Sequence, residues 1–437
     1  MKIAIIGAGY SGLTIAKELR KQNHDITIYE KEDHVGGMVS TIDIFNTKLE
    51  KYYRHIFKSD EDVINLINEL GLSNELIWPS TKMGYLSNNN IYEFGTPISL
   101  LKFNELSFIE KMKFGFNVLH IKTINNYKKL EKYTAEEWLR NRIGNNVYSK
   151  IWEPLLISKF GDEKSRVSMA WLWGKIKLRS SSSNKDGEQL GYIKGSYQVL
   201  TDAFYKKLLA NGIKFKLNAN VISIEKEENC YSITYENDGK KETDNKFDLI
   251  ISTLNYEILK KLCIDYMTQN EKEKIEKVKY TGARTMIIVS DTSFSKYYWL
   301  NIGDKNIPFG GIIEHTNFIN KSNYNNNNII YISNYMTENN KLYNCSKEEL
   351  FNTYIKYLNK VNPKFSEKNV KEYYVFDEKY AQPIIECNYS KYIMSKKLEK
   401  EKIYICTMPQ IYPEDRGMNY AIKLGKEISN KIIEEVD

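Results

Sequence analysis

The sequence contains few cysteines, and none of them belongs to a recognisable motif. Its 437 residues include five cysteines, which are scattered, odd in number and never spaced as Cys-x-x-Cys. Such a distribution excludes a disulfide framework and indicates reduced thiols in a cytoplasmic protein. The five histidines lie far apart in the sequence, with no pair at a spacing that would ligate a metal ion. We therefore predict no metal site.

Long apolar runs and a large excess of one charge are also missing. No run of about 18 apolar residues occurs, so we expect no transmembrane helix. The chain has 63 basic and 56 acidic residues, and its net charge of +7 is mild for this length. It gives no nucleic-acid-binding signature, although it suits anionic substrates or a membrane surface. The apolar start, which includes three glycines, indicates a strand rather than a signal peptide.

What the sequence does contain is a complete strand–turn–helix–strand unit at its start. An apolar run typical of a buried parallel strand leads into Gly-Ala-Gly-Tyr-Ser-Gly, then into residues with helical spacing, and then into a second apolar run. The expected elements are a strand over 2–6, a glycine-rich turn over 7–12, a helix over 13–21 and a strand over 26–29. This order is that of a βαβ dinucleotide-binding unit.

Each glycine of the turn has a specific task in such a unit. Gly7 permits the tight turn, Gly9 lets the backbone approach a pyrophosphate, and Gly12 lets the helix pack on the strand. The helix N-terminus then faces the phosphates. Glu30, at the end of the second strand, is placed to accept hydrogen bonds from a ribose diol. A glycine-rich turn without a ligand is the alternative, but it does not explain Glu30.

A second glycine pair indicates which dinucleotide is bound. Glu30 and Lys31 are followed closely by Gly36, Gly37 and Met38. At this point the sequence resembles the FAD-dependent superfamily of amine oxidases, protoporphyrinogen oxidases and carotenoid desaturases, whose members carry a Gly-Gly pair shortly after the ribose-binding acid. The resemblance implies FAD rather than NAD. The cofactor-binding residues that it implies here are Gly7, Gly9, Tyr10, Ser11, Gly12, Glu30, Lys31, Gly36, Gly37 and Met38.

The resemblance extends to two later segments. In a β-rich segment it implies that the backbone of Val221 contacts the adenine, although a plain strand valine is the alternative. Near the C-terminus, Gly417, Met418 and Asn419 lead into a helix. In the superfamily this helix N-terminus faces the pyrimidine edge of the flavin, where its dipole stabilises negative charge on reduction. We therefore add these positions to the predicted cofactor site.

These motifs together predict an α/β fold with a Rossmann-like FAD-binding domain and an interleaved mixed α+β substrate domain. The FAD-binding domain is expected to combine residues 1–90, 190–285 and 395–437. The substrate domain is expected to combine residues 91–189 and 286–394. The chain contains no internal repeat, which excludes a solenoid.

Three side chains are candidates for the chemistry. Arg54 and His55 follow the Gly-Gly turn, in a segment that lies beside the flavin ring in the superfamily. His55 can move a proton at neutral pH, or simply pack by Tyr53. Arg54 can bind an anionic substrate group or form a surface ion pair. In the Glu314–His315 pair, adjacent strand residues point to opposite faces, so only one can face a pocket, and we favour His315.

The resemblance implies an FAD-dependent oxidoreductase that transfers a hydride from a small-molecule substrate, such as a glycan or lipid precursor, to flavin N5. A non-redox nucleotide-sugar mutase that uses reduced FAD is the alternative, because His55-Ile56-Phe57 resembles a stretch of the UDP-galactopyranose mutases, with Lys58 where their second histidine stands. A scaffold that keeps FAD only structurally is a further alternative. No second Gly-x-Gly-x-x-Gly motif occurs, so no separate NAD(P)H-docking domain is expected. The oligomeric state is left open.

One apolar stretch outside these motifs contains several lysines. Residues 97–121 include Ile98-Ser99-Leu100-Leu101 and Phe114-Gly115-Phe116. Such a stretch suits peripheral membrane contact or the wall of a lipid pocket. Ordinary core helices are the interpretation that we expect.

Overall fold

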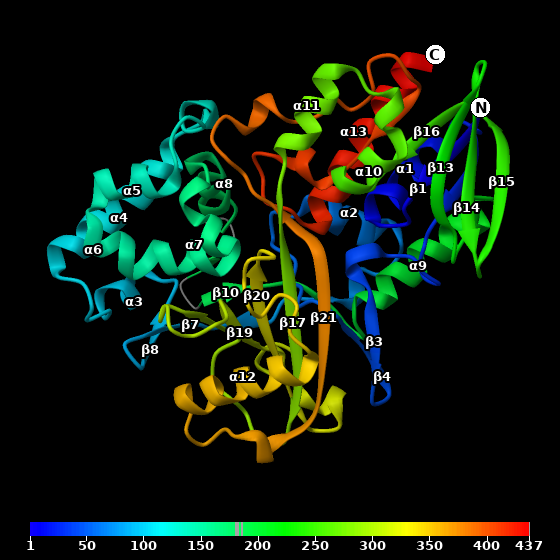
Figure 1. Ribbon diagram of the computed structural model, residues 1–437. Coiled ribbons are helices and arrows are strands. Elements are labelled where there is room, and N and C mark those ends of the chain that lie inside the picture. Colours follow the sequence, from blue (N-terminus) through cyan, green and yellow to red (C-terminus); the bar gives the residue numbers. More distant parts are fainter. Residues whose placement is uncertain (180–182, 185–186, 437) are drawn as a thin grey trace.

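The computed structural model describes residues 1–179, 183–184 and 187–436. Two large sheets and a separate group of helices organise the chain (Figure 1). The first sheet is parallel, with the strand order β12-β2-β1-β16-β22. Its strands are β1 (Lys2–Ile6), β2 (Asp25–Tyr29), β12 (Lys214–Lys216), β16 (Leu249–Ser252) and β22 (Ile403–Ile405). The apolar runs of β1, β2 and β16 are almost entirely buried, as expected for the centre of a parallel sheet. The predicted α/β fold is confirmed.

Four helices accompany this sheet. They are α1 (Tyr10–Arg20), α2 (Glu61–Glu69), α9 (Tyr197–Ala210) and α13 (Met418–Val436). The first starts three residues before the predicted helix, directly after Gly9. It packs closely on α13, because a Cβ atom on Gly425 would lie only 3.1 Å from the carbonyl oxygen of Ser11. The first and last helices of the chain therefore lie side by side.

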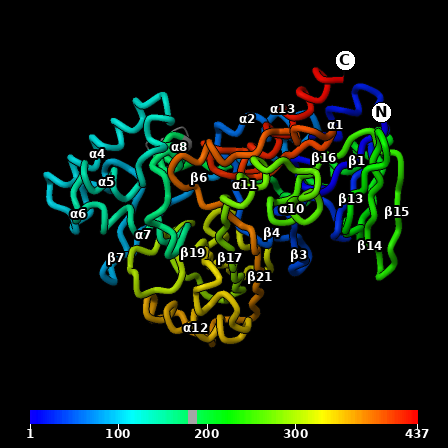
Figure 2. Tube along the Cα trace, turned by 45° about the horizontal axis from the view of Figure 1, so that its top comes forward, coloured from blue at the N-terminus to red at the C-terminus, as the bar shows by residue number. Residues whose placement is uncertain are grey.

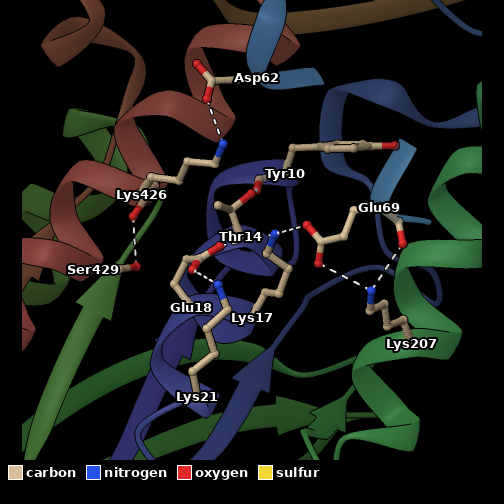
Figure 3. Close-up of polar contacts among 11 residues, drawn as sticks. Tyr10, Thr14, Lys17, Glu18, Lys21, Asp62, Glu69, Lys207, Lys426 and Ser429 are labelled. Atoms are coloured by element: carbon tan, nitrogen blue, oxygen red, sulfur yellow. Dashed lines mark hydrogen bonds and ion pairs between the residues drawn. The ribbon is translucent and has the colours of Figure 1, made fainter. Parts of the chain in front are cut away.

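Ion pairs fasten these helices to one another (Figure 3). Lys17 of α1 lies 2.5 Å from the carboxylate of Glu69 in α2, and Lys207 of α9 reaches the same carboxylate at 3.3 Å. Lys426 of α13 lies 2.7 Å from Asp62 of α2. The Lys17 side chain is only 8% exposed, so its pairing with Glu69 is shielded from solvent on the lysine side. These contacts fix the direction in which α1 points.

The second sheet has the order β21-β17-β20-β19-β18-β7-β8. Its strands are β7 (Met83–Ser87), β8 (Asn90–Phe94), β17 (Tyr280–Ser290), β18 (Trp299–Ile302), β19 (Gly311–Glu314), β20 (Asn328–Met336) and β21 (Val370–Pro383). Helix α12 (Lys347–Val361) covers part of it, with Leu350 and Tyr354 packed in the same core cluster as Ile288 and Ile332. This sheet brings residues from the N-terminal, middle and C-terminal thirds of the chain together.

The strands of the two sheets relate differently to the predicted domain division. Strands of the first sheet come from all three stretches expected for the FAD-binding domain. In the second sheet, the boundary at residue 90 coincides with the start of β8, and the boundary at residue 285 falls inside β17. The stretch 91–189 includes residues 180–182 and 185–186, which lie outside the described residues. The domain division stays a prediction.

A group of helices lies apart from both chain termini, at the left of Figure 1 and again in the turned view of Figure 2. It consists of α3 (Pro97–Leu101), α4 (Phe108–Thr123), α5 (Ala135–Ile143), α6 (Asn145–Val147), α7 (Glu153–Phe160) and α8 (Met169–Arg179). The expectation of ordinary core helices over 97–121 is wrong for one face of this segment. Phe108 and Phe116, for example, are 68% and 64% exposed.

The remaining elements are short. An antiparallel sheet consists of β13 (Asn220–Glu227), β14 (Cys230–Asn237) and β15 (Lys240–Phe247), and a hairpin of β3 (Thr41–Ile44) and β4 (Thr47–Glu50). Others are α10 (Tyr256–Cys263), α11 (Gln269–Lys277), β5 (Leu76–Ile77), β6 (Ser80–Thr81), β9 (Ser183–Asn184), β10 (Gly187–Gln189) and β11 (Tyr192–Ile193). Across the described ranges, no helix combines the length and apolar character needed to cross a bilayer.

Candidate active site

The glycine-rich turn between β1 and α1 leaves a space that the protein itself does not use. A Cβ atom on Gly12 would lie 2.1 Å from the carbonyl oxygen of Gly7, and one on Gly7 would lie 2.2 Å from Thr253 Oγ1. Both glycines are therefore required by packing. A Cβ atom on Gly9 would meet nothing within 4 Å, and its φ of −72° is open to any residue. The open space at Gly9, at a helix N-terminus, fits a pyrophosphate.

The second glycine pair lies directly against this turn. Gly36 donates its N–H to the carbonyl oxygen of Ala8 at 2.9 Å, and Cβ on Gly37 would lie 3.2 Å from the Cα of Gly9. Gly36 and Gly37 have φ values of 114° and 57°, in the region that favours glycine. The two glycine motifs, separate in sequence, form one continuous backbone surface.

Glu30 lies at the end of β2, facing the same turn. Its carboxylate accepts hydrogen bonds from the N–H of Ala8 at 2.8 Å and of Glu32 at 3.1 Å. The backbone N–H of Ala219 bonds to the carbonyl oxygen of Glu30, which brings the β13 segment with Val221 to this end of the sheet. A buried carboxylate so held can still accept hydroxyl donors at its remaining lone pairs. The arrangement fits the ribose side of a dinucleotide.

Three other predicted cofactor residues have side chains that contact protein atoms. The Tyr10 hydroxyl is buried at 3.0 Å from Thr201 Oγ1, so its side chain belongs to the core. Ser11 Oγ donates to the carbonyl oxygen of Ala421 in α13 at 3.3 Å. The Lys31 ammonium is at the surface, 3.3 Å from Glu32. We propose that these three positions serve the cofactor through their backbone.

A cavity lies where α13 begins. Its volume is about 180 Å³. Its lining comes from residues 52–57 and 415–420, from Met38, and from strands of the second sheet and helices α7 and α8. The predicted residues Met38, Gly417, Met418 and Asn419 are thus brought together with Arg54 and His55. Asn419 also has a structural task, since its Oδ1 accepts the N–H of Val63 in α2 at 3.1 Å.

The Arg54 side chain is half-buried in the wall of this cavity, and its Nε atom is buried. Its Nη2 donates to the carbonyl oxygen of Met38, whereas Nε has no hydrogen-bond partner within the part of the chain that the structure describes. Burial lowers the pKa of Arg54, against the smaller opposing effect of Tyr197. A buried N–H of a cation that lacks a hydrogen-bond partner is costly unless a ligand completes it. Arg54 is not the surface ion pair that the sequence left open.

His55 lines the cavity among aromatic rings. Its Nδ1 lies 3.2 Å from the hydroxyl of Tyr298, and its ring meets Phe57 edge-on at 4.9 Å between centroids. Trp299 of β18 stands on the same side of the cavity at a ring distance of 6.3 Å. Apolar rings around an imidazole hold its orientation, as a proton-transferring group requires.

A second cluster of charged residues lines the cavity, from helix α8 and from the segment just before α13. Lys175 and Trp171 both donate to the carboxylate of Asp415. Arg416 donates to Gln382 Oε1 at 2.7 Å and also to the hydroxyl of Tyr335. Burial alone would raise the pKa of Asp415, but the charge of Lys175 and its cationic neighbours lowers that pKa far below its usual range. Asp415 is therefore ionised and held by Lys175.

Tyr335 and Lys159 complete this cluster. The Lys159 ammonium lies 4.5 Å from the ring centroid of Tyr335. No carboxylate of the described residues lies within ion-pair distance of it, although its charge acts on Asp415 from farther away. Burial raises the pKa of Tyr335, but the charges of Arg416 and Lys159 outweigh it and lower the pKa below its ordinary value. Sequence reasoning missed Lys159, Lys175 and Tyr335, because a chain with 33 tyrosines and many lysines gives no signal for any single one.

His315 lies elsewhere. It is 1% exposed, does not line the cavity, and its Nε2 is 2.8 Å from the hydroxyl of Tyr324. The rings of Tyr192, Phe318 and Tyr331 surround it. Burial lowers the pKa of His315 to about 3, so the imidazole is neutral at physiological pH. The structure does not bring His315 to His55, so His315 lies outside the candidate active site.

Known proteins share this fold and parts of this sequence. The chain is 24% identical over 263 residues to the chloroplastic protoporphyrinogen oxidase of Nicotiana tabacum, covering 53% of this chain and 47% of that protein. It is 30% identical over 162 residues to the 15-cis-phytoene desaturase of Synechococcus elongatus, covering 32% of this chain and 33% of that protein. The chain thus spans half or less of the length of these curated relatives.

Solved structures match along the whole chain. Putrescine oxidase bound to putrescine has a TM-score of 0.77 at 16% identity, with 99% of both chains covered. The cyclohexylamine oxidase of Brevibacterium oxydans has a TM-score of 0.71 at 14% identity, covering 100% of this chain and 99% of that one. At these identities the likeness shows the fold. Residues 10–382 match the model of a family described as flavin containing amine oxidoreductase. This chain therefore belongs to the flavin containing amine oxidoreductase family, and the FAD cofactor and oxidoreductase class predicted from the sequence are those of its family.

Proposed function

We propose that the protein is an FAD-dependent oxidoreductase whose small-molecule substrate carries an anionic group. The charge of the cavity is the observation that supports this proposal. Arg54, Lys159, Lys175 and Arg416 line it, against the carboxylates of Asp60 and Asp415. Burial raises the pKa of Asp60 to about 6, which weakens its charge further near neutral pH. An enclosed excess of cations favours an anion, because charges interact more strongly where water is excluded.

Each cation has a different capacity for this task. Lys175 is already held by Asp415, and Arg416 is partly engaged by Gln382. Lys159 has no carboxylate within ion-pair distance in the described part of the chain, and Arg54 keeps an unused N–H. We assign the first contact with the anion to Lys159 and a further hydrogen bond to Arg54. Arginine suits such a role because its fork matches carboxylate and phosphate geometry.

The cofactor fits beside this anion site. Met38 and the start of α13 at Met418 line the cavity, and Gly37, the neighbour of Met38, lies against Gly9. Glu30 bonds to Ala8 in the same glycine-rich turn. When bound, FAD would supply the hydride acceptor. The N-terminus of α13 would stabilise negative charge near Met418, since helix N-termini carry partial positive charge. Ring side chains such as Trp299 would exclude water from the reacting region.

We assign proton transfer to His55, and a matched histidine pair tests the assignment. Gln in place of His55 keeps a polar side chain near Tyr298 but cannot transfer a proton. We expect His55→Gln to lower kcat by roughly 10²-fold or more while the melting temperature changes little. Steady-state kinetics and thermal unfolding of the purified holoprotein measure both quantities. An unchanged kcat would contradict the role of His55.

His315→Gln is the control, with the opposite expected pattern. The folded-state pKa of His315 is about 3, below the ordinary value of 6.5, so the unfolded chain binds a proton that the folded chain does not. Stability is therefore lost as pH falls below about 6.5, by about 2 kcal/mol between pH 6.5 and 5 from this group alone. Urea unfolding at several pH values should show this slope in the wild type and a smaller one in the variant, with kcat retained. Equal slopes would show that His315 is not buried as described.

Turnover with matched compounds tests the substrate class. We expect amines or alcohols that carry a carboxylate or phosphate to bleach the flavin absorption band under anaerobic conditions, and their neutral amides or esters to react at least tenfold more slowly. Equal reactivity of charged and neutral partners would contradict an anion site. A nucleotide-sugar mutase would also need these cations, because its substrate carries a diphosphate. Isomerisation without stoichiometric bleaching would favour that alternative, and no turnover at all would favour a scaffold.

A further inference from the structure

Exposed apolar side chains gather on one face of the helical group. Of the twelve large apolar side chains exposed in the described residues, seven lie within α3 and α4. Their exposed fractions range from 40% for Met112 to 68% for Phe108. These seven are Ile98, Leu101, Phe108, Ile109, Met112, Phe116 and Leu119, and we call them the α3–α4 apolar face. Surface apolar residues are normally scattered singly, so such a concentration marks an interaction site.

Helix α4 is apolar on two sides, and only one side is used by the core. Ile121 is buried, and Phe114 and Val118 pack against the same core cluster. On the other side, Phe108 and Phe116 lie about two helical turns apart on one stripe. Met112 lies between them, and Leu119 follows Phe116 on the same stripe. A helix that is apolar all round is normally buried. The outer stripe of α4 therefore lacks its natural cover.

Lysines border this stripe on both sides. At about 100° per residue, Lys113 falls roughly 90° around the helix from the centre of the stripe, and Lys111 and Lys122 fall about as far on the other side. Lys102 follows α3. The glutamates of this segment are engaged: Glu110 caps the helix at Ser107, and Glu105 pairs with Lys150 at 2.6 Å. The border of the apolar face is thus cationic.

We propose that the α3–α4 apolar face docks on the surface of a lipid bilayer that contains anionic lipids. Apolar side chains would enter the boundary between headgroups and acyl chains, while the flanking lysines extend toward the anionic headgroups. A second copy of the chain fits this face less well. Around a two-fold axis the same patch meets itself, so the lysine borders would face each other.

The α3–α4 apolar face belongs to the same group of helices as part of the cavity wall. In Figures 1 and 2, α7 and α8 lie between α4 and the rest of the molecule. These two helices carry Lys159 and Lys175 into the cavity. The group of helices that would rest on the bilayer therefore also supplies the wall of the proposed anion site. A substrate with an anionic head and an apolar tail suits both features.

Vesicle sedimentation of the full-length holoprotein tests this proposal. The probes are vesicles of pure phosphatidylcholine and vesicles that also contain about 30% phosphatidylserine. We expect the wild type to bind the anionic vesicles, and added salt to weaken binding because exposed charges are screened. Phe108→Ser with Phe116→Ser should lower the bound fraction at least tenfold. Lys113→Gln with Lys122→Gln should weaken binding to the anionic vesicles alone. Leu209→Ser, which changes an apolar side chain 44% exposed on α9, should have no effect.

Flavin absorbance and melting temperature establish that each variant is folded. The proposal is overturned if the wild type binds neither kind of vesicle at low salt, or if the double phenylalanine variant binds as well as the wild type. It is also overturned if the wild type is a dimer that this variant converts to a monomer without any effect of lipid. That last result would assign the face to a second copy of the chain.

Discussion

Gly9→Ala is expected to lose most of its FAD while the apoprotein stays as stable as the wild type. The added methyl group meets no protein atom within 4 Å, and the backbone conformation of Gly9 accepts alanine. It would instead occupy the space where a pyrophosphate approaches the backbone. We expect at least a tenfold loss of FAD affinity, or about 1.4 kcal/mol. Titration of apoprotein with FAD, beside a thermal unfolding curve without FAD, measures the two quantities.

Two further glycine variants make this result specific. Gly12→Ala would place a methyl group 2.1 Å from the carbonyl oxygen of Gly7, so it should destabilise the apoprotein by about 3 kcal/mol. Gly115→Ala, in α4, meets nothing within 4 Å and should change neither FAD affinity nor the fold. A Gly9→Ala protein with normal FAD content would show that the pyrophosphate does not lie against this turn.

Lys159→Met is the second variant with a large expected effect. It keeps the length of the side chain but removes a cation that, among the described residues, has no carboxylate within ion-pair distance. A hydrogen bond to a charged group in a site shielded from water contributes about 1.5–3 kcal/mol. We therefore expect the variant to bind anionic substrates and carboxylate inhibitors roughly 10- to 100-fold more weakly. Neutral analogues should bind as before, because their affinity never depended on this charge.

Lys305→Met is a suitable control for charge in general. Lys305 pairs with Glu153 at 2.6 Å and does not line the cavity, so its loss changes the net charge equally without touching the proposed site. If both variants weaken anion binding to the same extent, long-range attraction rather than a contact at Lys159 explains it. If Lys159→Met has no effect, the anion site is wrongly placed.

The strand–turn–helix unit at the N-terminus was the most predictable part of this fold. Its strand, turn and helix are local in sequence, and the glycines at 7, 9 and 12 have backbone tasks that few other residues can perform. The parallel sheet followed because each strand is a short apolar run. Arg54 and His55 also line the cavity. Their position shortly after the second glycine pair had indicated this.

The substrate side was predictable only in part, because it depends on contacts between distant segments. Lys159, Lys175 and Tyr335 come from two helices and one strand of the second sheet, and nothing in their local sequence distinguishes them from other lysines and tyrosines. His315 shows the opposite error. A histidine beside a glutamate suggested chemistry, but both side chains are buried. The imidazole of His315 is engaged in a hydrogen bond with the hydroxyl of Tyr324.

For a similar reason, the sequence offered an exposed face of α4 only as the alternative to a core helix. Apolar residues on all sides of a helix usually indicate burial, and the core does cover one side through Ile121. Which side remains open depends on the neighbouring helices and not on α4 itself. Composition therefore suggested a core helix, whereas packing left Phe108 and Phe116 exposed.

The most direct test of the account is the visible absorption spectrum of purified holoprotein during titration with simple carboxylates at two ionic strengths. We expect a flavin spectrum that shifts saturably as the anion binds, with weaker binding at the higher ionic strength and in Lys159→Met. A flavin spectrum that no anion perturbs, while neutral amines shift it readily, would contradict the anionic substrate site.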